Sequence, residues 1–450
     1  MKEFDLIIVG SGPAGYVAAI RAGQLGMTIA LIEKESVGGM CLNWGCIPSK
    51  TLMESAKLFD KTTKAATFGI DGIDKKALAF NWQKATGRKD RIVTRLVKGV
   101  EFLLKKNNVE LITGEAKVTG PNKVSVGESE YSAKNIILAT GSRPDKSWAG
   151  NVDPSNIIEI DDFYKVSEIG ETFLVYGGGP SATEAAFMLR LIGKKVTIVT
   201  PEDSLMYMLD SSLTRFLADK FKKIGITVYT GRELTKQGEG GVFAGDDFIE
   251  CDTIINLANR TPVLPEISGT DITLDNGFVK IDEYMRTNVP TIYAVGDITG
   301  QITAHAGSAQ GLAAVNHLAG IDEPLDYGKL PMNIYLDPEI ASVGMTEEQL
   351  KDKNIEYKKG EFLLSANGKA MAEGTSEGFV KVLAETKYGE VMGVHIVAPG
   401  ATDMIAEAVA IMQLEGTMED VSHVIHAHPT ISETILEASF KAMDRPIHTV

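Results

Sequence analysis

The chain has 450 residues, 44% of them hydrophobic and 23% charged, which predicts two to four domains of about 100 to 200 residues each. Its net charge of −15 argues against nucleic acid and anionic membrane surfaces as partners, because both need clustered Lys and Arg. Its three cysteines exclude a secreted disulfide framework, and no apolar run reaches the roughly 18 residues of a membrane span.

The first 200 residues contain one local pattern twice: a β-branched run, a glycine-rich turn, a helical stretch that stops at a glycine, and a second strand. The strands lie at 4–9 and 28–32 in the first copy, and at 173–176 and 195–199 in the second. Both copies are typical of βαβ dinucleotide-binding units. The chain begins directly with this pattern and without signal-peptide features, so we expect a cytoplasmic protein.

The remaining elements predict a mixed C-terminal region. Buried strands are expected at 136–143 and 291–297, and a helix at about 303–318 is followed by a Pro- and Gly-containing linker at 322–330. Beyond it we expect alternating strands and two helices, at 340–344, 378–385, 391–397, 402–414 and 430–442. The predicted fold class is therefore α/β, with two Rossmann-like βαβ domains and a C-terminal α+β domain.

The first glycine motif has the geometry that a dinucleotide needs. Gly10 makes the tight turn, Gly12 lets the backbone approach a pyrophosphate, and Gly15 permits close packing of the helix. Glu33 ends the second strand, where an acid can bind a ribose hydroxyl. We therefore predict dinucleotide binding at this unit.

The second glycine motif is less regular. Gly177 and Gly179 hold the expected places, Ala182 replaces the third glycine, and Pro180 falls in the first helical turn. The second strand leads into Thr200 in place of an acid, although Glu202 and Asp203 follow closely and are candidates to replace it. A second nucleotide site is favoured over a structural βαβ unit.

Two cysteines, Cys41 and Cys46, follow a Gly-Gly pair at the start of a predicted helix. Cysteines at this spacing can form a disulfide, and a helix N-terminus favours the thiolate that disulfide exchange needs. A metal site would need more Cys or His at ligand spacing, and two buried structural cysteines would not explain the glycines. We interpret the pair as redox-active, and Cys251 as a core residue.

A candidate general base precedes the C-terminal helix. The segment His426-Ala-His428-Pro429-Thr430 is followed by Glu433. Imidazole has a suitable pKa to take a thiol proton near neutrality, and a carboxylate five residues on can fix its tautomer.

With these motifs the sequence resembles the pyridine nucleotide-disulfide oxidoreductase family over essentially its whole length. The resemblance implies FAD on the first βαβ unit, NAD on the second, and a C-terminal domain that forms a two-fold dimer. It also implies these ranges: 1–147 and 263–325 for the two parts of the FAD-binding domain, 148–262 for the NAD-binding domain and 326–450 for the dimerisation domain.

The resemblance also implies roles for single residues. Cys46 is expected to be the thiol next to the flavin and Cys41 the thiol that meets the substrate, with His428 and Glu433 reaching the cysteines of the partner subunit. Lys50 and Glu184 correspond to an ion pair beside the flavin. Further FAD contacts are implied for Thr140, Gly141, Asp297 and Ala304, and NAD contacts for Gly177, Gly179, Ala182 and Glu184.

The motif CLNWGCIPSK favours family members that oxidise dihydrolipoamide with NAD⁺, supplied on a lipoyl carrier of a 2-oxoacid dehydrogenase or a glycine cleavage system. Two alternatives remain: reduction of another small-molecule or protein disulfide by NADH or NADPH, and a flavin-bound assembly subunit without catalysis. Three departures from the family pattern, Thr200, Pro180 and Asn259, lie in or beside the nicotinamide domain.

Overall fold

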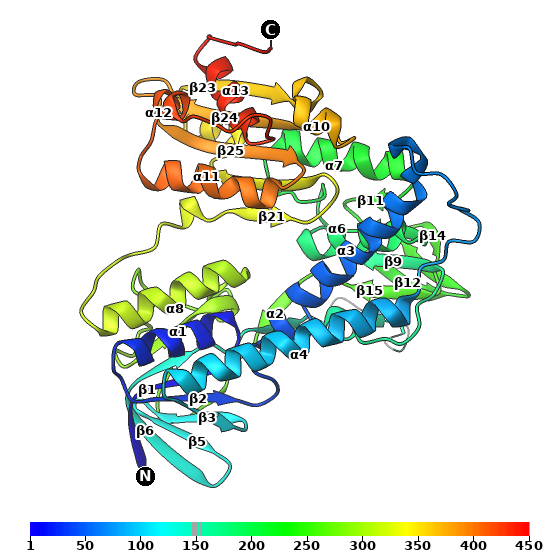
Figure 1. Ribbon diagram of the computed structural model, residues 1–450. Helices are drawn as coiled ribbons and strands as arrows, with labels where there is room; N and C mark the ends of the chain where they lie inside the picture. Colours follow the sequence, from blue (N-terminus) through cyan, green and yellow to red (C-terminus); the bar gives the residue numbers. More distant parts are fainter. Residues whose placement is uncertain (146–151, 154, 156, 450) are drawn as a thin grey trace.

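A computed structural model of the protein describes residues 1–145, 152–153, 155 and 157–449. In this part of the chain the structure has three large sheets, and helices from distant parts of the sequence connect them (Figure 1). None of its helices combines the length and apolar character needed to span a membrane.

The N-terminal sheet carries the first βαβ unit at its centre. Strands β1, β2, β3, β6 and β20 pair in parallel, and β4 and β5 form an antiparallel extension. β20 joins the sheet beside β6 although the whole second sheet lies between them in sequence. The strands are β1 (Lys2–Val9), β2 (Ile29–Glu33), β3 (Val109–Thr113), β4 (Ala116–Gly120), β5 (Lys123–Val126), β6 (Ser129–Leu138), β17 (Glu266–Ile267) and β20 (Ile292–Ala294).

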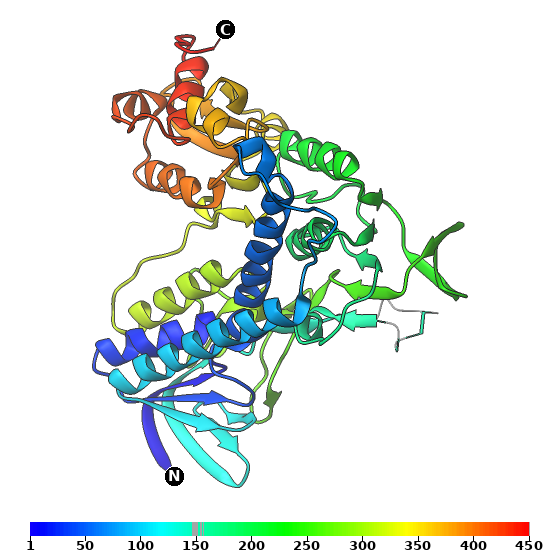
Figure 2. The ribbon, with the colours of Figure 1, turned by 45° about the vertical axis from the view of Figure 1, so that its right-hand side comes forward.

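Two helices lie side by side on this sheet: α1 (Pro13–Gln24) and α8 (Ala304–Leu318) (Figures 1 and 2). Small buried side chains, Ala14, Ala18 and Ala314, occupy the core that they share. Small residues allow the two helices to approach closely, because no bulky side chain separates their backbones. The start of α1 is therefore fixed by a helix almost 300 residues later in the chain.

The second sheet is all-parallel, in the order β11-β10-β9-β15-β8. Its strands and helices are β8 (Ile157–Glu159), α5 (Ile160–Phe163), β9 (Thr172–Tyr176), α6 (Pro180–Leu191), β10 (Lys195–Val199), α7 (Ser211–Ile224), β11 (Thr227–Tyr229) and β15 (Thr253–Asn256). A small antiparallel sheet, β12 (Leu234–Gly238), β13 (Gly241–Ala244) and β14 (Asp247–Glu250), precedes β15.

Three helices of the N-terminal part connect the sheets: α2 (Gly39–Asn43), α3 (Cys46–Thr63) and α4 (Trp82–Lys106). α3 packs against α4 and against α6 of the second sheet. The Trp82 indole donates to the carbonyl of Val166 at 2.9 Å, and the Lys89 ammonium to that of Tyr164 at 2.9 Å. These bonds tie α4, against which the Cys46-bearing helix α3 packs, to the segment that follows α5.

The C-terminal sheet is antiparallel, in the order β21-β22-β25-β24-β23. Its elements are β21 (Met332–Ile334), β22 (Glu339–Gly344), α9 (Glu347–Asp352), β23 (Tyr357–Leu363), α10 (Gly368–Ala372), β24 (Phe379–Glu385), β25 (Val391–Ala398), α11 (Ala401–Gln413), α12 (Met418–His423) and α13 (Glu433–Ala442). Two short pairs, β7 (Ser142–Pro144) with β16 (Arg260–Pro262) and β18 (Leu274–Asp275) with β19 (Phe278–Val279), complete the strands of the described residues.

The architecture confirms the predicted fold class, with two parallel βαβ units and a C-terminal α+β part. The last helix begins at Glu433, slightly later than expected. The expected boundary between 147 and 148 lies outside the described residues, within 146–151.

Candidate functional site

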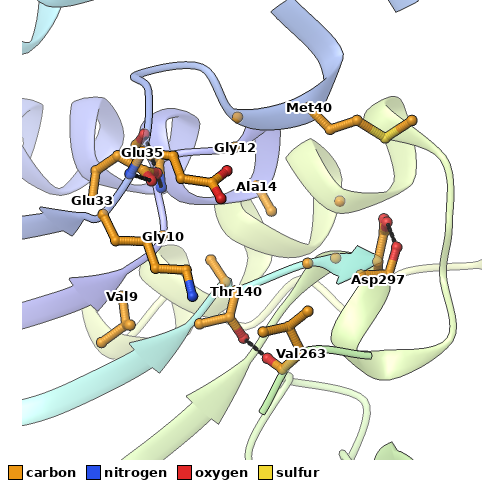
Figure 3. A pocket seen from close by; sticks show the side chains of 18 of the residues that line it. Val9, Gly10, Gly12, Ala14, Glu33, Glu35, Met40, Thr140, Val263 and Asp297 are labelled. Atoms are coloured by element: carbon orange, nitrogen blue, oxygen red, sulfur yellow. Dashed lines mark hydrogen bonds between the residues drawn. The ribbon is translucent and has the colours of Figure 1, made fainter. Parts of the chain in front are cut away.

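The first glycine-rich turn joins β1 to α1 and lines a cavity (Figure 3). A Cβ added to Gly15 would lie 1.9 Å from the carbonyl oxygen of Gly10, so the close contact of helix and turn requires glycine there. A Cβ added to Gly12 meets nothing within 4 Å. The turn therefore presents bare backbone to open space at a helix N-terminus, where anions bind.

Glu33 holds this turn from the end of β2. Its Oε2 accepts hydrogen bonds from the Ser11 amide at 2.9 Å and the Ser11 hydroxyl at 2.7 Å, and its Oε1 accepts from the Glu35 amide at 2.8 Å. Glu33 also lines the cavity. Glu33 is thus placed where the predicted contact with a ribose is possible, and it also holds the turn, a contact that no sequence motif indicates.

The other wall of the cavity comes from residues far along the chain. Asp297 accepts a hydrogen bond from the Ser142 hydroxyl at 2.5 Å, and the Thr140 hydroxyl donates to the carbonyl of Val263 (Figure 3). Arg260 donates to the Ser142 hydroxyl at 2.8 Å, a contact that the sequence did not reveal. The same cavity is lined by Gly141, Ala304, Cys41 and Cys46. One long cavity thus extends from the Glu33 end of the turn to the two cysteines.

The two cysteines lie on separate helices, which corrects the expectation that one helix start carries both. Cys41 lies in the short helix α2, and Cys46 is the first residue of α3, after Gly45. Cys251 is buried directly after β14, and burial raises the pKa of its thiol to about 11. These surroundings agree with a core role for Cys251.

The surroundings of Cys41 and Cys46 push their pKa values apart. The hydrogen bond between the two thiols lowers the pKa of Cys46, and the nearby Lys50 ammonium lowers it further. The same hydrogen bond, together with burial, raises the pKa of Cys41. The arrangement therefore favours a Cys46 thiolate that accepts a hydrogen bond from a Cys41 thiol.

Lys50 and Glu184 form a part-buried ion pair, with Nζ and Oε2 2.6 Å apart. Burial alone would lower the pKa of Lys50, but the charge and hydrogen bond of Glu184 outweigh it and raise the pKa. The Tyr335 amide donates to Glu184 at 3.1 Å, and the Tyr335 ring centroid lies 4.5 Å from the Lys50 ammonium. Tyr335 thus brings the C-terminal part of the chain into contact with the Lys50–Glu184 pair. The sequence patterns did not predict this contact.

His428 and Glu433 form a second pair, with Nδ1 and Oε1 2.8 Å apart. Glu433 Oε2 accepts a hydrogen bond from the Thr430 amide at 2.8 Å, so its carboxylate is held in place. Since a carboxylate only accepts, the proton of a neutral His428 ring lies on Nδ1 and leaves Nε2 as the basic atom. The His428 side chain is 80% exposed.

His428 is not brought to the cysteines of its own chain. The helix α13, which begins five residues after it, is well separated from α2 in both views (Figures 1 and 2). The segment before His428 also exposes apolar side chains to solvent, and Ile425 is 98% exposed. Exposed apolar residues of this kind are typical of a surface covered by another chain.

His426, the other histidine of this segment, has a structural environment. Its ring nitrogens lie 2.9 Å from Glu407 Oε1 and 3.1 Å from the Val424 carbonyl oxygen. Both partners are acceptors, and the hydrogen bond with Glu407 raises the pKa of His426. A ring that donates on both sides is not available as a base.

The second glycine-rich turn joins β9 to α6, and Pro180 is the first residue of that helix, as expected. Ala182 and Thr200 are buried, and the Thr200 hydroxyl donates to the carboxylate of Glu202. A Cβ added to Gly178 would lie 2.6 Å from that hydroxyl and 3.4 Å from Glu202 Oε2. Glu202 therefore brings a carboxylate to the turn at which Thr200 supplies none.

The region around Asn259 retains backbone contacts with the first unit. The Asn259 carbonyl accepts from the Asp145 amide at 2.9 Å, and β16 pairs with β7 next to it. The neighbouring Arg260 reaches Ser142 and, at 3.4 Å, Asp161. The side chain at 259 is not needed for these bonds.

Known proteins match the whole chain. Residues 4–313 match the family "Pyridine nucleotide-disulphide oxidoreductase", and residues 330–439 match the dimerisation domain of the same family. The chain belongs to the pyridine nucleotide-disulphide oxidoreductase family. It is a flavoprotein disulfide oxidoreductase whose redox pair is Cys41–Cys46, and the matching dimerisation domain supports a homodimer.

Two curated members of the family illustrate the similarity. The chain is 35% identical to a dihydrolipoyl dehydrogenase of Rhizobium etli over 99% of both chains. It is 36% identical to a dihydrolipoyl dehydrogenase of Bacillus subtilis, over 98% of this chain and 99% of the relative. The structure of LpdA from Mycobacterium tuberculosis superimposes with a TM-score of 0.88 over 98% of this chain and 99% of that one, at 23% identity, which supports the fold.

The family binds FAD and a pyridine nucleotide, and the first cavity fits FAD. Its open backbone at Gly12 suits a pyrophosphate, and its length from Glu33 to Cys46 suits a ligand with a nucleotide at one end and a redox-active ring at the other. Asp297 and Thr140, from two other segments of the family fold, line the space between.

Proposed function

We propose that the protein is a dihydrolipoyl dehydrogenase: as a homodimer it oxidises the dihydrolipoyl group of a carrier protein and reduces NAD⁺. The observation that carries the proposal is the combination, in one chain, of the Cys41–Cys46 pair and the His428–Glu433 pair. The proposal is supported by full-length relatives named dihydrolipoyl dehydrogenase at 35% and 36% identity. The carrier of a 2-oxoacid dehydrogenase or of a glycine cleavage system is the proposed partner.

The proposed exchange uses this chain's residues in a fixed order. The partner subunit's His428 takes the proton of one substrate thiol, and the resulting thiolate attacks Cys41 of the oxidised pair. A mixed disulfide forms, the Cys41–Cys46 bond breaks, and Cys46 leaves as a thiolate. The second substrate thiol then attacks the mixed disulfide and releases the lipoyl disulfide, and its proton passes to the leaving Cys41 sulfur, so that the partner's His428 keeps the first proton.

Two electrons then reside on the cysteine pair. FAD, when bound in the first cavity, supplies the acceptor through which they reach NAD⁺. Lys50 stabilises the Cys46 thiolate by its charge, and Glu184 holds Lys50 in place. Gly10, Gly12, Gly15, Glu33, Thr140, Gly141, Asp297 and Ala304 are the proposed FAD contacts, and Gly177, Gly179, Ala182 and Glu184 the proposed NAD contacts.

We expect NADH to be preferred over NADPH, because the Glu202 carboxylate at the second turn would bind a ribose hydroxyl and repel a 2′-phosphate. Replacing Glu202 by Gln should reduce the preference by about tenfold or more, the value of a hydrogen bond to a charged group. Steady-state kinetics with both nucleotides measure it. Glu239→Gln, at an exposed position between β12 and β13, is the control. A Glu202→Gln variant with an unchanged NADH-to-NADPH ratio would contradict the assignment.

The ion pair beside the cysteines should tune the Cys46 thiolate in opposite directions. Lys50→Met removes a charge that lowers the pKa of Cys46, so the thiolate should form at higher pH than in the wild type. Glu184→Gln removes a charge that raises this pKa, so the thiolate should form at lower pH. The pH dependence of thiolate absorbance in the reduced protein measures both, and two shifts of the same sign would be incompatible with this electrostatic account.

The substrate is tested by comparing turnover of lipoamide and glutathione disulfide, each with NADH and NADPH. Faster turnover of lipoamide with NADH than of any other combination is expected. Preferred turnover of glutathione disulfide, or of another disulfide, would show instead a reductase of that substrate. FAD binding without turnover of any disulfide would show a non-catalytic assembly subunit.

A further inference from the structure

The loop between β10 and α7, residues 200–210, folds back over the second glycine-rich turn. The Met206 amide donates to the Gly178 carbonyl at 2.8 Å, and Glu202 lies beside the same glycine. Leu205, Met206 and Leu209 are buried in the core that this loop shares with α6 and α7. The position of the loop therefore sets the position of Glu202 at the turn.

The loop ends at Asp210, whose side chain is fully buried. Its Oδ1 accepts from the Ser212 amide at 2.9 Å and hydroxyl at 2.6 Å, which caps the N-terminus of α7. Two further donors come from the C-terminal part of the chain: the Lys381 ammonium at 2.5 Å from Oδ1 and the Glu347 amide at 3.0 Å from Oδ2. Asp210 thus joins the nucleotide-binding loop to the C-terminal sheet.

Lys381 is the cation that balances Asp210. It is 2% exposed and lies on β24 opposite His395 of β25, which in turn pairs with Ser342 of β22. The His395 ring lies 2.8 Å from the Ser342 hydroxyl through Nδ1 and 3.1 Å from the Met345 carbonyl through Nε2. Because a carbonyl only accepts, Nε2 carries a proton. Burial lowers the pKa of His395 to about 4, so the ring is neutral and Nδ1 accepts from the Ser342 hydroxyl.

Glu347, a second acid beside Lys381, has partners of its own. It lies 3.2 Å from Lys381, and it also contacts Lys351 at 3.1 Å, Lys359 at 3.3 Å and the Tyr357 hydroxyl at 2.8 Å. Asp210 has fewer cationic partners: Lys381 is the one ammonium or guanidinium that the described residues place against it, and the His395 Nε2 lies 3.8 Å from its Oδ2. A buried carboxylate of this kind depends strongly on its partner.

We propose that the Asp210–Lys381 ion pair is a positioning device, through which the C-terminal domain sets the loop that carries Glu202 and thereby the affinity of the nicotinamide nucleotide site. The inference rests on the proposed NAD site at the second glycine-rich turn. Neither residue touches the nucleotide. Both act by fixing residues 200–210 against Gly178.

The test uses the FAD-loaded homodimer, titrated in its oxidised form with NAD⁺, together with steady-state kinetics. Lys381→Met alone leaves a buried unpaired carboxylate, so the main variant is the neutral pair Asp210→Asn with Lys381→Met, in which Asn keeps the helix cap. Asp210→Asn alone is the second variant, because Lys381 retains Glu347. Lys223→Met is the matched control: it removes a pair between α7 and Glu377 of the C-terminal part, at an exposed site away from the loop.

We expect both variants to weaken NAD⁺ binding by about tenfold or more, to raise KM for NAD⁺ in proportion, and to change kcat by less than about threefold. FAD content and dimer mass should stay at the wild-type values, and deuterium uptake should rise in residues 200–210. Lys223→Met should bind NAD⁺ like the wild type. Wild-type NAD⁺ affinity in the neutral pair, or an equal loss in Lys223→Met, would overturn the proposal.

A further variant separates this proposal from the proposed function. A Cβ at Gly179 meets nothing within 4 Å, so Gly179→Val fills only the space expected for the nucleotide. If Gly179→Val leaves NAD⁺ binding intact, the proposed NAD site is wrong. If Gly179→Val abolishes binding and the neutral pair does not weaken it, the site stands and the positioning role of Asp210 and Lys381 falls.

Discussion

Mixing inactive Cys41→Ser subunits with inactive His428→Gln subunits is expected to restore about one quarter of wild-type activity. In each heterodimer one site would combine the intact cysteine pair of one chain with the intact base of the other, and random exchange makes about half of the dimers heterodimers. Separately, His428→Gln should lower turnover by about 10²- to 10⁴-fold, the usual contribution of a general base.

The reason lies in the placement of the base. A base must come within about 3 Å of the proton it takes, directly or through one water. His428 precedes α13, in a part of the chain well separated from α2 and Cys41 (Figure 1). Its exposed ring and the exposed Ile425 beside it leave that surface for a second chain.

The control mixes Cys41→Ser with Cys46→Ser subunits under the same exchange conditions. Every site then contains one broken cysteine pair, so no activity should appear although heterodimers form. Native mass spectrometry counts the heterodimers in both experiments. If the Cys41→Ser and His428→Gln mixture stays inactive with heterodimers present, the base acts within its own chain and the shared site is wrong.

Replacing Cys46 by Ser is expected to abolish the long-wavelength absorption of the reduced, FAD-loaded protein, whereas Cys41→Ser should show this absorption without any reductant. Such a band requires a thiolate against oxidised flavin, and the surroundings lower the pKa of Cys46 but raise that of Cys41. Both variants should lose disulfide turnover by about 10³-fold or more, because neither can form the mixed disulfide and resolve it.

The measurement is the absorption spectrum as a function of pH. Falling pH should remove the band in Cys41→Ser as the Cys46 thiolate takes up a proton. Cys251→Ser is the control and should keep the wild-type band, because Cys251 lies in the core beside β14 and does not line the FAD cavity. A band retained in Cys46→Ser and lost in Cys41→Ser would exchange the roles of the two thiols.

Local sequence patterns predicted the two βαβ units well. The close contact of helix and turn at Gly15 tolerates only glycine, so the motif itself indicates the contact. Motifs that each lie within a few residues named Gly10, Glu33, Thr140 and Asp297 as candidates, and the fold places all four around one cavity. The long helix α4 and the small sheet of β12, β13 and β14 were not predicted, since no motif marks them.

Contacts between distant segments could not be predicted from the same patterns. Asp210 and Lys381 are 171 positions apart, and no motif around either residue indicates a buried ion pair. The acid at the second glycine-rich turn could not be predicted either, although the candidates lie only two and three positions after Thr200. The sequence left Glu202 and Asp203 as equal candidates to replace an acid at 200, and only the fold brings Glu202 to Gly178. The contact of Tyr335 with the Lys50–Glu184 pair is of this kind too.

The place of β20 and α8 in the N-terminal sheet has a consequence for biosynthesis. α1 and β6 have been made by residue 138, but α8, which covers α1, ends at residue 318. At about 5 to 20 residues per second the ribosome needs roughly 10 to 35 s for that interval. In that time the second sheet, complete at residue 256, has all its strands, while the first glycine turn still lacks Asp297 and its covering helix. The nascent chain therefore cannot acquire FAD in its finished cavity until two thirds of its length has been translated.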